Sequence, residues 1–317
     1  MSHESRDSLF IEEKRRLDHR KGRLMRRSRM INSIRNFFLD HDYLEVETPQ
    51  LIPAPAPETH IDAIKAEGFF LHTSPELCMK RLLAAGFPRI FQITKCFRNN
   101  ERGEFHLPEF TMLEWYHSGI EYRQLMEECR ELILNVSEQL GSPNKIRYRG
   151  RDCGLKSDWE KISVSRAFEK YSHLSMKDSL DKGLFDVMMA TEIEIHLGTS
   201  TPTFLYDYPA SHAALSRLKP GNRALAERFE LYAFGLELAN GFSELTDAGE
   251  QRRRFEKERI SRQILGNDIY PMPEKFLQIL DHMPQASGIA LGLDRLAMLY
   301  TDSTKIDDVV AFTPEEL

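Results

Sequence analysis

The stretch Cys96–Tyr116, CFRNNERGEFHLPEFTMLEWY, constrains the fold of this chain more than any other. Its two extended runs are joined by a polar, turn-prone segment, a pattern that predicts a long β-hairpin. Because side chains alternate along a strand, Glu114 and Tyr116 should share one face with Phe110 and Met112. A carboxylate and a phenol on one face favour a ligand-binding floor, although an ordinary hairpin with one exposed face fits the same pattern.

Composition excludes several classes of protein. With 317 residues the chain can bury a large core, and 41% hydrophobic and 29% charged residues are ordinary for a water-soluble enzyme. No apolar run approaches the ~20 residues that span a bilayer, and the N-terminus lacks the apolar centre of a signal peptide. The four cysteines form no CxxC pair, which argues against a zinc site or a disulfide framework. We therefore expect a cytoplasmic protein that makes no membrane contact.

Charge is distributed unevenly along the chain. The net charge of -6 disfavours a general nucleic-acid binder, yet Lys14–Arg35 holds ten Lys or Arg against one Asp. This basic stretch fits a solvated helix face with salt bridges to a neighbouring subunit. A docking surface for an acidic macromolecule is the alternative.

Apolar periodicity predicts the order of the main elements. Residues 1–16 are expected to be a flexible N-terminal segment, and 17–317 one domain. Helices are predicted over 17–40, 74–83, 122–140 and 251–265, with one or two more within 163–203. Strands are predicted over 43–48, 69–72, 90–93, 203–208, 228–232 and 236–239. The polar, basic residues 142–158 are expected to form a loop.

Three groups of residues outside the hairpin are candidates for ligand binding. The first is Ser74-Pro75-Glu76, at a predicted helix start. Ser74 can cap the helix and Pro75 suits its first position. Glu76, in the first turn, either complements the helix dipole or faces a ligand.

The second group is a pair of glutamates. Glu230 and Glu237 lie on two strands that turn near Gly235, and we expect them to face one another. Two facing carboxylates with nothing basic between them are unfavourable unless a cation lies there, which makes them a candidate Mg²⁺ pair. Two glutamates on a solvated sheet face fit the same pattern.

The third group follows a glycine-bearing strand near the C-terminus. Gly288 and Gly292 allow something to approach the backbone closely. Arg295 falls in the first turn of the next predicted helix, where the backbone dipole already favours anions. The arginine adds to that field, so we expect a bound phosphate.

Together these stretches resemble the three motifs of class II aminoacyl-tRNA synthetases. Residues 31–49 are similar to motif 1, the helix and strand that form the dimer in that family. Residues 96–116 are similar to motif 2, with Arg98 as its arginine, and 287–299 to motif 3, with Arg295. The resemblance implies an α+β fold, a mainly antiparallel sheet flanked by helices, and a homodimer.

The runs PEFTMLE (108–114) and ELANGFSE (237–244) are similar to the lysine-specific branch of that family. The chain is too short to carry the anticodon-binding barrel that precedes motif 1 in lysyl-tRNA synthetase. It resembles instead the truncated paralogues of that enzyme that modify elongation factor P. The paralogues share Ala290, where the synthetase has glycine, and this implies a preference for (R)-β-lysine over α-lysine.

The resemblance implies an ATP-dependent, AMP-forming ligase that uses Mg²⁺, activates (R)-β-lysine or lysine, and transfers it to elongation factor P. Arg98 and Arg295 are the implied catalytic residues. Nucleotide contacts are also implied for Asn99, Asn100, Glu101, Phe110, Glu237, Leu238 and Gly292, and Mg²⁺ contacts for Glu230 and Glu237. Contacts to the amino acid are implied for Ser74, Pro75, Glu76, Glu114, Tyr116, Asn240, Glu244 and Ala290.

Two positions depart from the family pattern. Its motif 2 has glutamate where this chain has Asn100, with Glu101 one residue later, and asparagine where this chain has Leu107. Three other functions are compatible with the sequence. They are a minimal enzyme that charges tRNA (disfavoured by the negative net charge), a catalytically inactive lysine-sensing paralogue, and a small-molecule amide synthetase.

Overall fold

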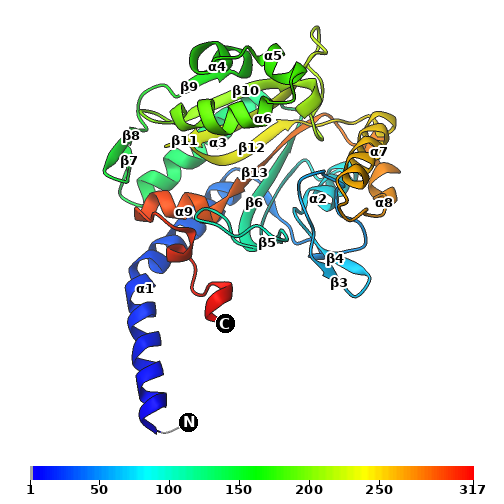
Figure 1. Cartoon of the computed structure of the whole chain (residues 1–317). Helices are drawn as coiled ribbons and strands as arrows, with labels where there is room; N and C mark the ends of the chain where they lie inside the picture. The colour runs from blue at the N-terminus through cyan, green and yellow to red at the C-terminus, as the bar shows by residue number, and fades with distance from the viewer. Residues whose placement is uncertain (1–2) are drawn as a thin grey trace.

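The computed structural model describes residues 3–317, and an eight-stranded mixed sheet forms its centre (Figure 1). The strand order is β1 (Leu44–Glu45), β5 (Arg89–Phe97), β6 (Glu109–Ser118), β13 (Ala286–Gly292), β12 (Leu236–Ser243), β11 (Leu225–Ala233), β10 (Thr203–Pro209) and β9 (Glu160–Ser163). The outermost pairs, β1–β5 and β9–β10, are parallel, and the other neighbours are antiparallel. The predicted α+β fold is confirmed, and the three sheets formed by the described residues include no closed barrel.

Helices pack on the sheet in three groups, each with its own apolar cluster. The largest cluster joins the sheet to α1 (His3–Asp40), α3 (Tyr122–Gln139) and α9 (Leu293–Thr301). A second lies under α2 (Glu76–Ala84), α7 (Ala248–Ile264) and α8 (Glu274–Leu277). A third lies between β10 and the short helices α4 (Val164–Tyr171), α5 (Met176–Asp181) and α6 (Phe185–Met188). None of the helices in residues 3–317 combines the length and apolarity needed to span a bilayer.

Two small sheets complete the fold. The first contains β2 (Leu51–Ile52), β4 (Phe69–Leu71) and β3 (Lys65–Ala66). The second is the hairpin β7 (Lys145–Tyr148) and β8 (Arg151–Gly154), so the loop predicted over 142–158 is wrong. Arg149 and Gly150 have φ of 51° and 74°, the left-handed pair that a tight two-residue hairpin turn requires. The predicted strand 43–48 is also shorter than expected, because only β1 pairs with β5.

Helix α1 begins at His3, so the predicted start at Leu17 is wrong, and residues 3–16 of the predicted flexible segment are helical. Met1 and Ser2 lie outside the described residues. No glycine or proline precedes Gly22, and the Glu, Lys, Arg and Leu residues there favour a helix. Figure 1 shows the N-terminal part of α1 projecting from the body of the molecule. The Arg20 guanidinium ties this helix to the C-terminus by donating to Glu316 at 2.7 and 2.9 Å.

Arg262 of α7 is a fully buried cation that holds the loop preceding β3. Its guanidinium donates to the backbone oxygens of Glu58 (2.6 Å) and Ile61 (3.0 Å) and to the Asp62 carboxylate (2.6 Å). Arg262→Met would leave these acceptors unpaired. We expect urea denaturation to show a loss of about 3–5 kcal/mol in unfolding free energy.

Arg252 provides a matched control on the same helix. Its guanidinium pairs with Glu274 at 2.9 Å on the surface, so Arg252→Met should cost less than about 1 kcal/mol. Equal losses for the two variants would contradict the role given to Arg262.

Candidate active site

A cavity of about 420 Å³ opens where the β5–β6 hairpin, β11, β12, β13 and the starts of α2 and α9 converge. Most of the predicted site residues line it: Ser74, Glu76, Arg98, Glu101, Phe110, Glu114, Tyr116, Glu230, Glu237, Leu238, Asn240, Ala290, Gly292 and Arg295. Asn99 and Asn100 are exposed and lie outside the lining, and Pro75 is the N-cap of α2. Glu244 is 2% exposed and lies behind the lining.

The predicted hairpin is confirmed and supplies one wall of the cavity. β5 and β6 pair without interruption from Arg89 opposite His117 to Phe97 opposite Glu109. The predicted alternation also holds, because Glu114 and Tyr116 face the cavity while Trp115 is buried in the main apolar cluster.

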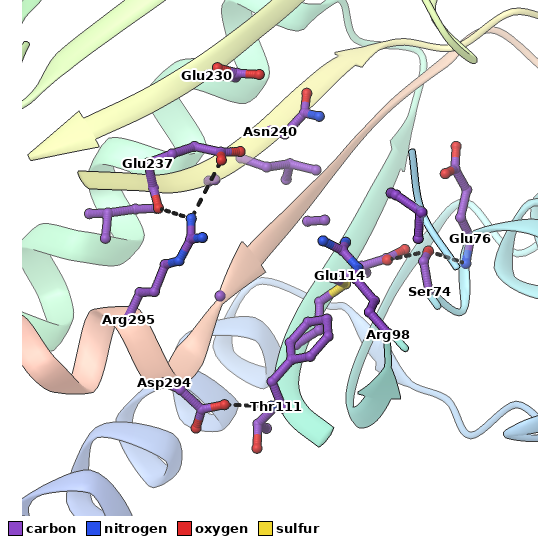
Figure 2. A pocket seen from close by; sticks show the side chains of 18 of the residues that line it. Ser74, Glu76, Arg98, Thr111, Glu114, Glu230, Glu237, Asn240, Asp294 and Arg295 are labelled. Carbon is purple, nitrogen blue, oxygen red and sulfur yellow. Dashed lines mark hydrogen bonds and ion pairs between the residues drawn. The ribbon is translucent and has the colours of Figure 1, made fainter. Parts of the chain in front are cut away.

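The two predicted arginines reach into the cavity from different elements (Figure 2), and Arg228 of β11 also lines it. Arg98 follows β5, and its guanidinium carbon lies 5.0 Å from the centre of the Phe110 ring. Arg295 lies in the first turn of α9, and its Nη1 donates to the backbone oxygen of Glu237 at 2.8 Å. Arg295 Nη2 lies 2.6 Å from Nε2 of His106. Two guanidinium groups in one cavity suit a ligand that carries several phosphates.

Asp294 fixes the start of α9 against β6. One carboxylate oxygen of Asp294 accepts from the Thr111 backbone N–H at 2.6 Å, as Figure 2 shows, and the other pairs with Arg27 of α1. Arg27 also donates to the Thr111 hydroxyl at 2.9 Å. The start of α9, which carries Arg295, is therefore braced against β6 and α1 by these contacts.

The expectation that Glu230 and Glu237 face one another is wrong. A register shift at Leu231 and Tyr232 places Glu230 opposite Asn240, and Glu237 opposite Tyr232. The expectation that nothing basic lies near them is also wrong. Arg228 Nη2 donates to Glu230 at 2.7 Å, and Arg295 Nη1 lies 3.4 Å from the Glu237 carboxylate.

The carboxylates of Glu230 and Glu237 are nevertheless close enough for the charge of one to act on the pKa of the other. Burial is the main cause that raises the pKa of Glu237, and the charge of Glu230 adds to it. The other oxygen of Glu230 accepts from the hydroxyls of Tyr208 and Tyr232 at 2.5 and 2.6 Å. Within residues 3–317 no group of three or more His, Cys, Asp or Glu side chains is arranged to hold a metal ion. The Mg²⁺ pair therefore stays a prediction.

The end of the cavity away from Arg295 and Glu237 is acidic (Figure 2). The Ser74 hydroxyl donates to one Glu114 oxygen at 2.6 Å, and the Tyr116 hydroxyl donates to the other at 2.9 Å. Glu76 lies beside them at the start of α2 (Figure 2), where its backbone N–H donates to Ser74 Oγ at 3.0 Å. This end of the cavity suits a ligand with positive charge.

Gly288, Ala290 and Gly292 alternate along β13 and present one face of the strand to the cavity. A Cβ at Gly288 would lie 2.3 Å from Tyr116 Cε1 and 2.5 Å from a Glu244 carboxylate oxygen. The predicted close approach at Gly288 is therefore confirmed. At Gly292 the nearest atoms would be 3.9 Å away, an ordinary van der Waals distance, so a methyl group fits there without a clash.

Comparison with known proteins agrees with this geometry. The family described as "tRNA synthetases class II (D, K and N)" matches residues 11–316. The chain belongs to this family. It is 40% identical over 306 residues to a protein of Proteus mirabilis named elongation factor P–(R)-β-lysine ligase, covering 91% of this chain and 94% of that protein. Proteins of the same name from Edwardsiella ictaluri and Vibrio cholerae are 39% and 37% identical, and each alignment covers at least 91% of this chain and 94% of the relative.

Both departures from the class II motif lie where the hairpin loop meets the cavity. Asn100 has a φ of 63° and is exposed, whereas Glu101 lines the cavity and lies 3.8 Å from the Arg98 guanidinium. Leu107 is 4% exposed and joins the main apolar cluster. Glu101 is thus the better placed of the two polar residues, and its contact with adenine stays a prediction.

Reasoning from sequence alone missed several residues at the site. Lys80, on α2, is 1% exposed, and its Nζ lies 2.5 Å from both Glu76 and Glu244. Glu76 and Lys80 are four residues apart, but that spacing usually marks a solvated helix pair, so burial could not be read from it. Glu58 also lines the cavity, and burial, with the charge of Glu76, raises its pKa to about 7. Arg228 carried no signal beyond its position in a strand.

The acidic end should couple ligand binding to pH. Burial is the largest cause that raises the pKa of Glu114 and of Glu244 from 4.5 to about 8. Between pH 4.5 and about pH 8 the folded state therefore binds more protons than the unfolded state. The free energy of unfolding of the free protein then falls as the pH rises through this range. A bound diammonium ligand favours the ionised carboxylates and opposes this loss.

We therefore expect the increase in melting temperature caused by lysine to be larger at pH 8.5 than at pH 6. Calorimetric scans with and without lysine measure this, and leucine, which lacks the side-chain amine, is the control. Equal increases at the two pH values would contradict the raised carboxylate pKa values.

Proposed function

We propose that this chain is an ATP-dependent, AMP-forming ligase that activates (R)-β-lysine, or lysine, and transfers it to a lysine of elongation factor P. The observation that carries the proposal is one cavity that holds both Arg98 and Arg295 and has an acidic end formed by Glu76 and Glu114. Such a cavity matches a polyphosphate and a diamino acid together. Similarity to ligases of that name over nine tenths of the chain supports the choice of acceptor.

In the first step, a carboxylate oxygen of the amino acid attacks the α-phosphorus of ATP, and pyrophosphate leaves. Arg98 would bind the α-phosphate and the attacking carboxylate, and Arg295 the far phosphates. Steps of this kind depend on positioning and on stabilisation of charge, and need no nucleophile from the protein. Asp294 and Arg27 hold the two supporting elements in place.

Contacts to the nucleotide would come from residues between the two arginines. Phe110 offers a ring face for adenine, Glu101 an acceptor, and Leu238 and Gly292 the backbone. Glu230 and Glu237 have the carboxylate oxygens that Mg²⁺ prefers, and a cation beside them would oppose the rise in the pKa of Glu237. Bound there, the ion would neutralise phosphate charge.

The amines of the substrate would bind at the acidic end. Glu76 would take the α- or β-amine, and Glu244 the ε-amine, with Tyr116 and Asn240 beside it. Ser74 and Tyr116 hold the Glu114 carboxylate under the substrate through their hydroxyls.

In the second step, a neutral lysine amine of the acceptor attacks the carbonyl carbon of the adenylate. An amide forms, AMP leaves with the electron pair of the broken bond, and the attacking nitrogen loses a proton. We further propose that the chain forms a homodimer through α1 and β1, on its resemblance to motif 1.

Pyrophosphate exchange with (R)-β-lysine, α-lysine or no amino acid tests the first step. We expect exchange with the lysines and none without amino acid. Label transfer to elongation factor P, compared with transfer to tRNA, tests the second step. Transfer to tRNA alone would support the tRNA-charging alternative, and absence of exchange with either lysine would favour an inactive lysine-sensing protein.

Ala290 should set the choice between the two lysines. Its backbone lies opposite both Glu114 and Asn240, so its methyl group occupies the floor beneath the substrate. A methyl-sized change is worth about 1–3 kcal/mol of discrimination, so Ala290→Gly should raise the use of α-lysine relative to β-lysine about tenfold. Ratios of kcat/KM from exchange assays measure this. An unchanged ratio would show that Ala290 does not set the preference.

A further inference from the structure

Lys80 lies at the centre of the acidic end, although no step of the reaction uses it. Its ammonium group lies 2.5 Å from one oxygen of Glu76 and 2.5 Å from one oxygen of Glu244, and 5.1 Å from the centre of the Phe242 ring. With 1% of the residue exposed, this lysine is screened from water. A buried ammonium is costly unless it is paired, so both carboxylates are needed to keep it there.

The Lys80 ammonium pairs with one Glu244 oxygen, Oε2, at 2.5 Å. The other oxygen, Oε1, is buried and has no partner among the residues that the structure describes. A buried carboxylate in this condition still has its acceptor capacity available for a ligand. Lys80 thus supplies positive charge without taking the place of the substrate amine.

The charges at this end of the cavity can be counted. When Glu76, Glu114 and Glu244 are all ionised, as a bound diammonium ligand favours, they carry three negative charges and Lys80 carries one positive charge, which leaves two negative charges. The two amines of a lysine carry two positive charges. Without Lys80 the same end would hold one unbalanced buried charge after the substrate binds, and such a charge is avoided by taking up a proton.

We propose that Lys80 is a positioning residue that sets the charge of the amine end to match a ligand with two ammonium groups. This inference rests on the proposed function for the identity of the substrate. In this proposal Lys80 favours the ionised form of Glu244 and fixes the separation between the Glu76 and Glu244 carboxylates.

Other titratable groups near Lys80 also affect the net charge of this end of the cavity. From β6, Glu114 and the Tyr116 hydroxyl face this end of the cavity. From the loop before β3, Glu58 is close enough to Glu76 and to Arg98 for both charges to act on its pKa. Removing the Lys80 charge takes away a cause that lowers the pKa of Glu244, so that pKa should rise further.

Lys80→Met keeps most of the side-chain volume and removes the charge. We expect the KM for (R)-β-lysine in pyrophosphate exchange to rise at least about tenfold at pH 7 and by much less at pH 9, with the KM for ATP unchanged. Lys80→Arg keeps the charge, so its KM should depend on pH as in the wild type.

Lys145→Met is the matched control, because Lys145 pairs with Asp152 at 2.5 Å on the surface. Its KM values should equal those of the wild type.

Calorimetric binding of cadaverine, a diamine, tests the charge count without any reaction. Lys80→Met should bind cadaverine at least about tenfold more weakly than the wild type at pH 7 and approach it at pH 9. If that variant fails to fold, Lys80→Gln takes its place. A lowered melting temperature with the wild-type pH dependence of KM would show that Lys80 is structural and overturn the inference. Absence of wild-type exchange with either lysine would instead overturn the proposed function.

Discussion

Arg98→Ala is expected to reduce lysine-dependent pyrophosphate exchange about 10³-fold, mainly through kcat. In the proposed reaction, the guanidinium of Arg98 would contact the group whose charge changes during attack on the α-phosphorus. Alanine leaves that charge unmatched in a partly buried cavity, and a lysine could not reproduce its planar fork of donors. Binding of the substrate amines at the acidic end should persist, because Glu76 and Glu114 are unchanged in this variant.

Exchange assays at saturating ATP and lysine measure this effect, and calorimetry with lysine separates binding from reaction. Arg102→Ala is the matched control in the same hairpin loop. Arg102 pairs with Asp307 at 3.0 Å and Glu315 at 2.9 Å near the C-terminus and does not line the cavity, so its rate should stay within about twofold of wild type. Comparable losses for both variants would indicate that the loop, and not the Arg98 charge, limits the reaction.

Gly288→Ala is expected to raise the KM for lysine about 100-fold or more while ATP still binds. The added methyl carbon would lie 2.3 Å from the Tyr116 ring and 2.5 Å from the Glu244 carboxylate, so one of them must move. A displacement of about 1 Å in groups that position a substrate costs roughly 100-fold. Because Glu244 is one of the proposed amine ligands, the defect should fall on the amino acid.

Gly292→Ala gives the contrast on the same strand and the same face. Its added methyl carbon would have no atom nearer than 3.9 Å, so the KM for lysine should change by less than about threefold. Any change should appear in the KM for ATP. Initial rates with each substrate varied in turn distinguish the two outcomes, and a normal lysine KM in Gly288→Ala would contradict the amine site described here.

Local patterns in the sequence predicted the elements that carry the site. Alternation along 109–116 correctly placed Glu114 and Tyr116 on the cavity face, because a strand has a strict period of two. The position of Arg295 in the first turn of α9 follows from equally local rules, whereas α2 begins at Glu76 with Pro75 as its N-cap, one residue later than predicted. These rules act over a few residues, so the chain itself contains them.

Such local rules could not predict the pairing register of neighbouring strands or which side chains are buried. The shift at Leu231 and Tyr232 moved Glu237 away from Glu230, because a one-residue irregularity changes every later cross-strand pair. The extent of α1 was underestimated because residues 3–16 show little amphipathic pattern, and helix propensity alone is a weak signal.

The sequence by itself determined the order of the elements, the hairpin, the two arginines and the motifs that place the chain among class II synthetases. The tertiary structure alone decided that Lys80 lies between Glu76 and Glu244, and that Gly288 lies against Tyr116. The physical reason is distance along the chain. Backbone periodicity is set by neighbouring residues, whereas the charge balance of a buried cavity is set by side chains from α2, β6 and the end of β12, which meet only when the sheet forms.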